Sequence, residues 1–476
     1  MIYPKYLASL FLLVSFLFLN KVFSQESTIR YQVELNSNIS SQDSLTFWQT
    51  ANKFGAIPNS NTAQISAGLF RDFKDELEYG TVDYALGVQV TSSLADRNET
   101  IINQLYASAR WGKVQLDAGV KHREVLFEGL SSSNGEITMS TNARSIPGYN
   151  IYLTDFVKLP FAKKWLSFKG NYSDYLLNDK RAVDNARLHH KSLYFKYNLS
   201  EKLELITGLN HYVQWGGTSS TIGKQPSSFK DYLRVITAQS GGSDSTIGDQ
   251  INALGNTLGS YLFQLNYSGE KTNWNFYWSH PFEDRSGREL SNYPDALYGL
   301  FIDLKKPDGL ISHISTEVTY TKHQSGKSPH YTDVNGVSRQ ASGRDNYFNN
   351  GIYNSGWTYF GNSIGSPYFS TVPSNENGIT NGFIEGDNRF TAFNIGIKGR
   401  IHKFNYMTKL SHVTYLGWFE NEYEVKPKQF SGILEIKLPE IQKFPVDITF
   451  GTSFDTGTYR PVNFGGFLKL SKRGVF

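Results

Sequence analysis

The chain has 476 residues, with 47 Lys and Arg, 43 Asp and Glu, and no cysteine. Acidic and basic residues are interleaved, which is not typical of a nucleic-acid-binding protein, and the missing cysteine excludes a lipoprotein anchor, disulfides and thiolate metal sites. Aromatic residues reach 15% although apolar residues total only 39%. Such a mixture favours a membrane β-barrel over a soluble, Tyr-rich and Trp-rich carbohydrate-binding β-protein.

Residues 1–24 resemble an export signal. Lys5 supplies a positive start, the run from Leu7 to Leu19 is almost entirely apolar, and Ser24 precedes an expected cleavage before Gln25. The run is about 13 residues long, whereas a helix needs roughly 20 to span a bilayer. We therefore expect export of a mature chain covering 25–476.

The first part of that mature chain combines a strand with a helical pattern. Residues 25–40 are polar and suit the start of a first strand. Apolar residues then recur at helical spacing over 43–54, and the pattern stops at Gly55 and Pro58. The spacing predicts a short amphipathic helix on the periplasmic side of a barrel.

Strict alternation of large apolar residues with small or polar ones marks the strands. One example places Tyr84, Leu86, Val88 and Val90 on one face and Ala85, Gly87 and Gln89 on the other. Successive strand side chains point to opposite faces, so each segment has an apolar face and a polar one. A soluble sandwich can use the same pattern, but its repetition along an exported chain, with aromatic residues at strand ends, favours a transmembrane antiparallel β-barrel in outer-membrane lipid.

The chain has room for 16 to 18 such strands at roughly 10 residues each. Strands follow at short intervals up to about Lys121. The later candidates are 149–159, 165–175, 189–199, 202–215, 259–269, 272–281, 298–305, 311–322, 390–400, 404–416, 430–438, 445–455 and 462–470.

Three longer intervals interrupt the strands. Residues 216–257 include a second helical pattern at 227–238 and can lie on either side of the membrane. Residues 281–297 are rich in turn-forming residues. Residues 323–389 are rich in Gly, Asn, Ser and Tyr and are too long for a periplasmic turn, so we expect them outside the cell.

The last predicted strand has the spacing of terminal strands recognised by the barrel-insertion machinery. Asn463, Gly465, Leu468 and Leu470 form a polar–x–Gly–x–x–apolar–x–apolar pattern, followed by a basic tail that ends at Phe476. We therefore predict the insertion machinery as a partner.

Four groups of residues together resemble the capsule assembly Wzi family in its Bacteroidetes-type form. They are Phe47-Trp48 with Asn52-Lys53-Phe54-Gly55 and Pro58-Asn59; Gly129-Leu130-Ser131-Ser132 with Asn142-Ala143-Arg144-Ser145-Ile146-Pro147; Asn252-Ala253-Leu254-Gly255-Asn256 with Gly259-Ser260-Tyr261; and Asp345-Asn346-Tyr347-Phe348-Asn349-Asn350 with Gly356-Trp357-Thr358-Tyr359, Gly361 and Ile364-Gly365. The resemblance covers roughly residues 30–470. It implies an eighteen-stranded outer-membrane barrel with short periplasmic helices, for which 43–54 and 227–238 are candidates. It also implies a lectin that holds exported capsular polysaccharide at the cell surface.

No group of residues predicts catalysis, a cofactor or a metal site. His189 and His190 fall on opposite faces of a strand and cannot share a metal. His122, Glu124 and Glu128 suit polar pore lining better than acid–base chemistry, because no nucleophile motif accompanies them. A glycosidase-type pair from Glu283-Asp284 and Asp303 is possible in sequence alone, and we do not favour it.

The stretch 344–369 holds the best candidates for glycan binding. Sugars bind by stacking on aromatic faces and by hydrogen bonds to polar side chains. The candidates are Tyr347, Tyr353, Trp357, Tyr359 and, from another segment, Arg144. The aromatic residues can equally fold back to plug the barrel, and an inward arginine more often pairs with lumen carboxylates than with an acidic glycan.

We therefore predict a monomeric, non-enzymatic outer-membrane barrel that attaches or assembles capsular or other surface polysaccharide. The alternative is a porin-like diffusion or uptake channel, because strand alternation does not distinguish an open lumen from a plugged one.

Overall fold

The computed structural model describes residues 29–476 except 75–79, 163, 252, 327–329, 333–335, 337, 341–344, 373–378, 380–381, 384–386, 420 and 441–444. The export signal expected over residues 1–24 lies outside the described residues and stays a prediction.

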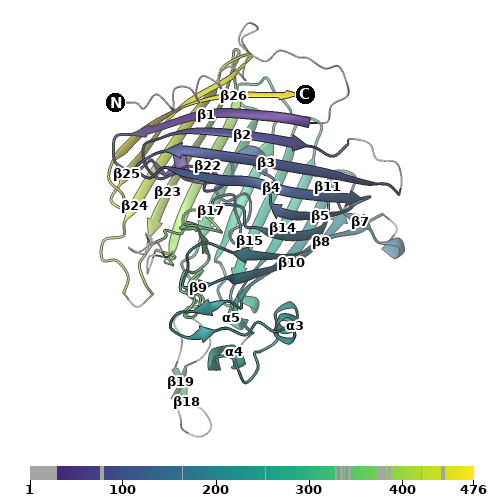
Figure 1. Cartoon of the computed structure of the whole chain (residues 1–476), viewed down its shortest axis with the longest axis vertical. Coiled ribbons are helices and arrows are strands. Elements are labelled where there is room, and N and C mark those ends of the chain that lie inside the picture. Colours follow the sequence, from purple (N-terminus) through teal and green to yellow (C-terminus); the bar gives the residue numbers. More distant parts are fainter. Residues whose placement is uncertain are drawn as a thin grey trace.

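Antiparallel strands form a closed barrel, as Figure 1 shows. Its sheet has 19 strands, of which the two-residue β7 (Val157–Lys158) only adds to the edge of β8, so eighteen form the wall. The wall strands are β1 (Ile29–Ser40), β2 (Thr62–Arg71), β3 (Val82–Leu94), β4 (Glu99–Trp111), β5 (Val114–Val120), β6 (Gly148–Leu153), β8 (Leu166–Leu177), β10 (Ala186–Asn198), β11 (Leu203–Trp215), β14 (Asn256–Ser268), β15 (Asn273–Phe282), β16 (Ala296–Asp303), β17 (His313–Tyr320), β22 (Phe390–Ile401), β23 (Phe404–Tyr415), β24 (Lys428–Lys437), β25 (Asp447–Gly457) and β26 (Asn463–Val475). β1 closes the barrel by pairing with β26, from Arg30 opposite Val475 to Ser40 opposite Gly465. The predicted barrel of about eighteen strands is confirmed.

The wall carries its apolar residues on the outside. In β3, Tyr84 and Leu86 are 52% and 47% exposed, whereas Asp83 and Ala85 between them are each 4% exposed. A soluble sandwich would show the opposite pattern, with its large apolar residues buried. The alternation therefore makes a lipid-facing outer surface and a polar or small-residue inner surface.

The two ends of the barrel differ in loop length. At one end the connections are short, such as 112–113 and 402–403, and there the amide of Phe476 donates to the carbonyl of Ile29 (2.9 Å). At the other end lie the long segments 41–61, 216–255 and 321–389. Outer-membrane barrels keep short turns in the periplasm and long loops outside. By this rule we assign the long-loop end, which includes 323–389, to the outside of the cell.

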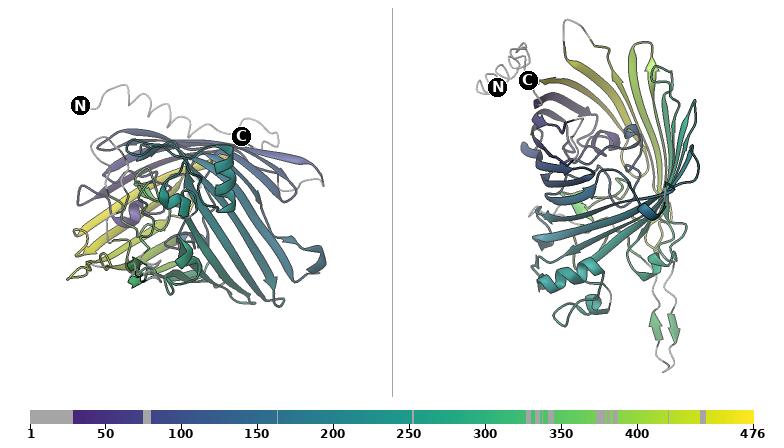
Figure 2. Two further views of the ribbon diagram at one scale, coloured as in Figure 1. Left: turned by 90° about the horizontal axis from the view of Figure 1, so that it is seen from below. Right: turned by 90° about the vertical axis from the view of Figure 1, so that its right-hand side faces the viewer.

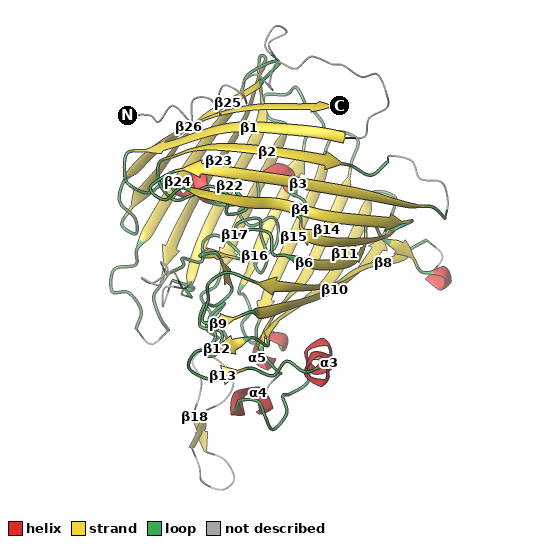
Figure 3. Ribbon diagram, in the orientation of Figure 1, coloured by secondary structure: helices red, strands yellow, loops and turns green. Residues whose placement is uncertain are grey.

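Smaller elements belong mainly to the long-loop end and the lumen (Figure 3). The helices are α2 (Phe47–Thr50), α3 (Phe229–Thr237), α4 (Ile247–Ile251) and α5 (Arg285–Arg288), with 3-10 turns η1 (Phe127–Gly129) and η2 (Pro160–Ala162). The small strands are β9 (Val183–Asp184), β12 (Thr218–Ser219), β13 (Gly223–Lys224), β18 (His330–Thr332), β19 (Ser338–Gln340), β20 (Thr358–Tyr359) and β21 (Asn362–Ser363). No helix among the described residues has the length and apolar character needed to cross a membrane.

The helix predicted over 227–238 is present as α3, and neither predicted helix lies at the short-turn end of the barrel. α3 lies at the long-loop end, and the segment 43–54 follows β1 and enters the lumen from that same end. Within 43–54 only one helical turn forms, and it ends at Ala51, whose backbone is extended. Asn52, Phe54 and Gly55 beyond it adopt left-handed backbone conformations, which do not continue a helix. The last strand also departs from the prediction, since β26 continues through the basic residues to Val475.

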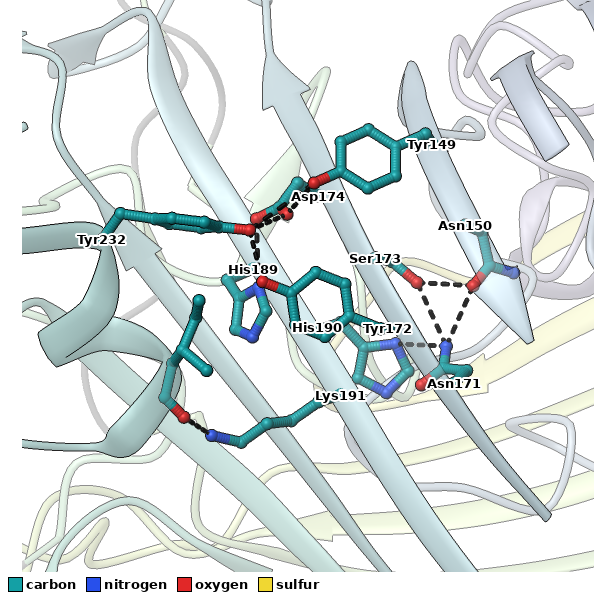
Figure 4. Close-up of polar contacts among 11 residues, drawn as sticks. Tyr149, Asn150, Asn171, Tyr172, Ser173, Asp174, His189, His190, Lys191 and Tyr232 are labelled. Carbon is teal, nitrogen blue, oxygen red and sulfur yellow. Dashed lines mark hydrogen bonds and ion pairs between the residues drawn. The ribbon is translucent and has the colours of Figure 1, made fainter. Parts of the chain in front are cut away.

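Helix α3 lies against the outer surface of the wall, over strands β8 and β10 (Figure 4). Asp174 accepts hydrogen bonds from Tyr232 of α3 and from Tyr149 (2.6 Å), and its other oxygen lies 3.0 Å from His189 Nδ1. The Lys191 ammonium donates to the last turn of α3. The helix thus covers a polar group on a surface that otherwise faces lipid.

Candidate functional site: a plugged barrel with a mouth cavity

Three segments fold into the lumen and hydrogen-bond to one another: 41–61, 121–147 and 345–371, here called the plug. The amide of Phe54 donates to the carbonyl of Thr141 (2.7 Å), and that of Ser140 to the carbonyl of Ile364 (2.8 Å). The right-hand view of Figure 2 shows chain filling the space inside the curved wall. The lumen at this level is therefore packed protein, with the large aromatic residues at its core.

The one-turn helix α2 fixes the first plug segment to the inner wall. A capping box between Thr46 and Gln49 organises its start, and Asp455 accepts a hydrogen bond from the Phe47 amide (2.9 Å). Trp48 Nε1 donates to Ser411 Oγ (3.1 Å). These contacts hold 41–61 against β23 to β25.

A buried carboxylate on the wall fixes the second plug segment. Glu317, on the inner face of β17, accepts hydrogen bonds from the Ser132 amide (2.6 Å) and the Tyr277 hydroxyl (2.6 Å). It is 3% exposed. A buried carboxylate needs hydrogen-bond donors, so Glu317 holds residues 131–132 in one position.

The third plug segment contains the four aromatic residues proposed as glycan contacts. Tyr347, Tyr353, Trp357 and Tyr359 are all 3% exposed or less. Trp357 Nε1 donates to the carbonyl of Thr138 (2.6 Å), and its ring meets Tyr212 edge-on. Of the two interpretations left open by the sequence, folding back into the barrel is the one the structure shows, and none of these four rings offers an open face for stacking.

A cavity of about 730 Å³ lies at the long-loop end, above the plug, and is here called the mouth cavity. Plug residues, the start of β4 and the β25–β26 turn line it, and among the predicted residues only Arg144 does so. The cavity contains one exposed aromatic ring, that of Phe360. It is also lined by the guanidinium groups of Arg144 and Arg460 and by amide side chains that include Asn142 and Asn362.

Arg144 is held by contacts on three sides. One terminal nitrogen lies 2.8 Å from each carboxylate oxygen of Glu99, Nε donates to the carbonyl of Gly55 (3.4 Å), and the guanidinium carbon lies 4.4 Å from the Phe360 ring centroid. Gly55 has a φ of +56°, and a Cβ there would lie 3.0 Å from Arg144 Cγ. Glycine at 55 therefore allows both the turn and the approach of the arginine. The expected pairing of Arg144 with a carboxylate is present.

Sequence patterns did not identify the other main components of this cavity. Phe360 is 41% exposed and has a positive φ of 47°, and its ring meets that of the buried Tyr359 edge-on at 4.8 Å between centroids. Arg460 lies in the short turn between β25 and β26, more than 300 residues from Arg144, and only strand pairing brings the two together. The Phe360-Gly361-Asn362 turn was a usable signal for an exposed ring.

The acid pair considered for catalysis and the histidine pair considered for metal binding are not brought together. Glu283 lies beside the long loop, where it accepts a hydrogen bond from the Phe348 amide, whereas Asp303 lies at the short-turn end of β16. His189 and His190 point to opposite faces, as Figure 4 shows. Among the described residues no group of three or more His, Asp or Glu is placed to hold a metal.

Buried carboxyls instead hold the long loop to the barrel. Asp295, just before β16, accepts hydrogen bonds from the amides of His323 (2.8 Å) and Gln324 (2.6 Å) and from the Tyr347 hydroxyl (2.9 Å). Burial raises the pKa of Asp295 to about 7 and that of the nearby Asp345 to about 6.

Comparisons with known proteins agree with this architecture. A family model described as capsule assembly protein Wzi matches residues 31–392. Among solved structures, the chain is similar to Escherichia coli Wzi, described as a carbohydrate-binding outer-membrane β-barrel involved in group 1 capsule assembly, at 14% identity and a TM-score of 0.54, over 94% of this chain and 84% of that one. Acinetobacter baumannii OccAB4 (9% identity, TM-score 0.47, 95% and 100% coverage) and Pseudomonas aeruginosa OccK3 (10%, 0.45, 94% and 96%) also match. No curated protein matches the chain.

Proposed function

This chain belongs to the capsule assembly protein Wzi family, and we propose that it holds exported capsular or other surface polysaccharide at the mouth cavity. The barrel lies in the outer membrane, with that cavity at its extracellular end. What supports the proposal most is the composition of the cavity above a closed plug.

The mouth cavity has the chemistry that sugar recognition needs. The exposed Phe360 face suits the apolar C–H side of a sugar ring, and the Arg144 guanidinium beneath it keeps the ring in place. Asn142, Asn362 and Arg460 supply donors and acceptors for hydroxyl groups. A polysaccharide strand resting here binds through several weak contacts, which suits retention of a long polymer better than capture of one small molecule.

The four buried aromatic residues take a positioning role in this proposal. Tyr359 precedes Phe360, and Trp357 anchors the same turn to the second plug segment. They act on the glycan through Phe360 and not by touching it. The plug also weighs against the porin-like alternative, because packed side chains occupy the path that a diffusing solute needs.

Three further parts of the proposal concern the wall: its contact with lipid, the monomeric state and insertion into the membrane. Its apolar outer residues, such as Tyr84 and Leu86, suit direct contact with lipid around a monomer. The terminal strand β26 presents Asn463, Gly465, Leu468 and Leu470 to the insertion machinery.

Capsule retention on living cells tests the function. Replacing both Arg144 and Phe360 with alanine should release polysaccharide into the medium while total synthesis is unchanged. Arg110→Ala is the matched control, because its guanidinium carbon lies 4.3 Å from the Phe73 ring outside the mouth cavity. Wild-type retention by the correctly inserted double variant would refute the mouth cavity as the binding surface, and wild-type retention in a deletion strain would refute the function itself.

A further inference from the structure

A second cavity, of about 500 Å³, lies inside the barrel and is here called the lumen chamber. It runs along the inner face of β1 from Gln32 to Asn38 and extends along the neighbouring wall strands as far as β4 on one side and β24 on the other. Nine of its 23 lining residues are Asn or Gln. A water-filled barrel lumen needs only polar walls of any kind. A surface this rich in amides calls for a different explanation.

Amides carry a donor and an acceptor on each side chain, as does each sugar hydroxyl. Several of these amides are oriented by neighbours: Gln104 Nε2 donates to Gln89 Oε1 (3.1 Å), and Gln64 Nε2 to the carbonyl of Ala56 (2.7 Å). The wall is therefore ordered, with fixed groups available to a ligand.

Other amide atoms in the chamber have no partner among the described residues. These are Asn36 Oδ1, Asn38 Nδ2 and Asn52 Oδ1, each without exposure to the surroundings. Asn38 is 2% exposed as a whole residue. Leaving such buried polar atoms unpaired is unfavourable. Because these three atoms are enclosed, the groups that a ligand in the chamber can meet are the accessible amides of the lining.

The charges of the chamber largely cancel. Lys53 lies 3.2 Å from Glu435, and Lys469 lies 3.9 Å from Glu34. Arg473, near the short-turn end, is the one lining Lys or Arg without an ion pair among the described residues. Lys469 lies opposite Asn36 in the pairing of β1 with β26, so the wall there carries charges of both signs with little net charge, which favours an uncharged ligand over an acidic one.

The plug separates this chamber from the mouth cavity. Ala56 and Ile57 line both spaces, so the turn that follows α2 is the partition between them. Arg144 and Gln64 hold the partition through the carbonyls of Gly55 and Ala56. The chamber extends instead toward Gln32 and Arg473, which lie opposite each other near the periplasmic end.

We propose that the lumen chamber is a second binding site, which takes an uncharged polyhydroxyl segment, such as a stretch of neutral sugar residues, from the periplasmic side. The site is independent of the mouth cavity, so either can fail without the other. Binding is reversible and involves no chemistry on the ligand.

Cysteine accessibility tests the proposal directly, because the natural chain contains no cysteine. Asn36→Cys places a single thiol in the chamber, and Phe360→Cys places one in the mouth cavity. The purified barrel in detergent is treated with a small cationic methanethiosulfonate reagent, with and without malto-, cello- or chitohexaose. Labelling at Asn36→Cys should slow about threefold when the free sugar is at about twice its Kd. Labelling at Phe360→Cys in the same samples reports on the mouth cavity separately.

Two further variants establish which residues are responsible. Asn38→Leu is added to the Asn36→Cys protein, with Gln32→Met as the second choice if Asn38→Leu does not fold. Either change should remove the protection of the thiol at position 36 by the sugar. Asn198→Leu, an amide outside the chamber, should leave it intact. Heat-modifiable gel mobility confirms folding of each variant. The proposal is overturned if Asn36→Cys is never labelled, if no neutral hexasaccharide protects it, if protection survives both chamber variants, or if a hyaluronan hexasaccharide, which is acidic, protects as well as the neutral sugars.

Discussion

Trp357 is the residue whose loss should open the plug. Its side chain is fully buried, packs edge-on against Tyr212 and donates from Nε1 to the carbonyl of Thr138 (2.6 Å). Replacing a buried Trp with alanine costs about 3–5 kcal/mol, to which an unsatisfied Thr138 carbonyl adds roughly 1–3 kcal/mol if water does not replace the donor. The ring contacts Tyr212 of wall strand β11 and its Nε1 bonds to the second plug segment, so the cost falls on the contacts that hold the third plug segment in the lumen.

Planar-bilayer recording is the assay for this loosening. Wild-type protein should pass little steady current, whereas Trp357→Ala should show frequent or sustained openings and faster proteolysis within 345–371. Trp274→Ala is the matched control, because that ring is 42% exposed on β15 and its Nε1 donates only to Thr272 (3.0 Å). A Trp357→Ala barrel that inserts normally and stays as closed as wild type would show that Trp357 does not hold the plug.

Three further outcomes follow from other parts of the molecule. Phe195→Arg should cost about 2–4 kcal/mol in unfolding from lipid if the residue lies near the midplane, and the neighbouring Lys196→Ala should cost little; equal losses would mean that the faces of β10 are misassigned. Tyr232→Phe removes the hydroxyl that α3 donates to Asp174, and should cost about 1–3 kcal/mol, seen as faster hydrogen exchange over 229–237 with an unchanged wall. Because the pKa of Asp295 is raised, its native carboxyl keeps a proton that the unfolded chain loses. The stability that this proton adds to the native state is complete below pH 3.8 and is lost as the pH rises toward about 7. Hydrogen exchange in the long loop should become faster over that range, and Asp295→Asn should reduce the change.

The wall could be predicted from the sequence because strand periodicity is a local property. Alternation such as that of Tyr84 and Leu86 with Ala85 and Gly87 depends on neighbouring residues alone. Most predicted strand ranges therefore lie close to those observed, for example 404–416 against β23 at Phe404–Tyr415, whereas 149–159 runs past the end of β6 at Leu153 and 462–470 stops short of the end of β26 at Val475. The helical spacing at 227–238 was correct for the same reason.

The plug could not be predicted in the same way. Residues 43–54 have helical spacing, but contacts to Ser411 and Asp455, more than 350 residues away, leave only one turn helical and place it in the lumen. The aromatic stretch near Trp357 gave no indication of whether its rings face solvent or the interior. The mouth cavity depends on the same long-range pairing, which is why Arg144 was recognised as a candidate while Arg460 was not.

Direct binding of the purified barrel to the surface polysaccharide of its own cells tests the proposed function most closely. Immobilised wild-type protein should bind the purified polymer, and the Arg144→Ala, Phe360→Ala double variant should bind at least about tenfold more weakly, a change of about 1.4 kcal/mol. Arg110→Ala should bind as wild type does. Absence of binding by the wild-type barrel, or equal binding by the folded double variant, would contradict the account of a polysaccharide held at the mouth cavity.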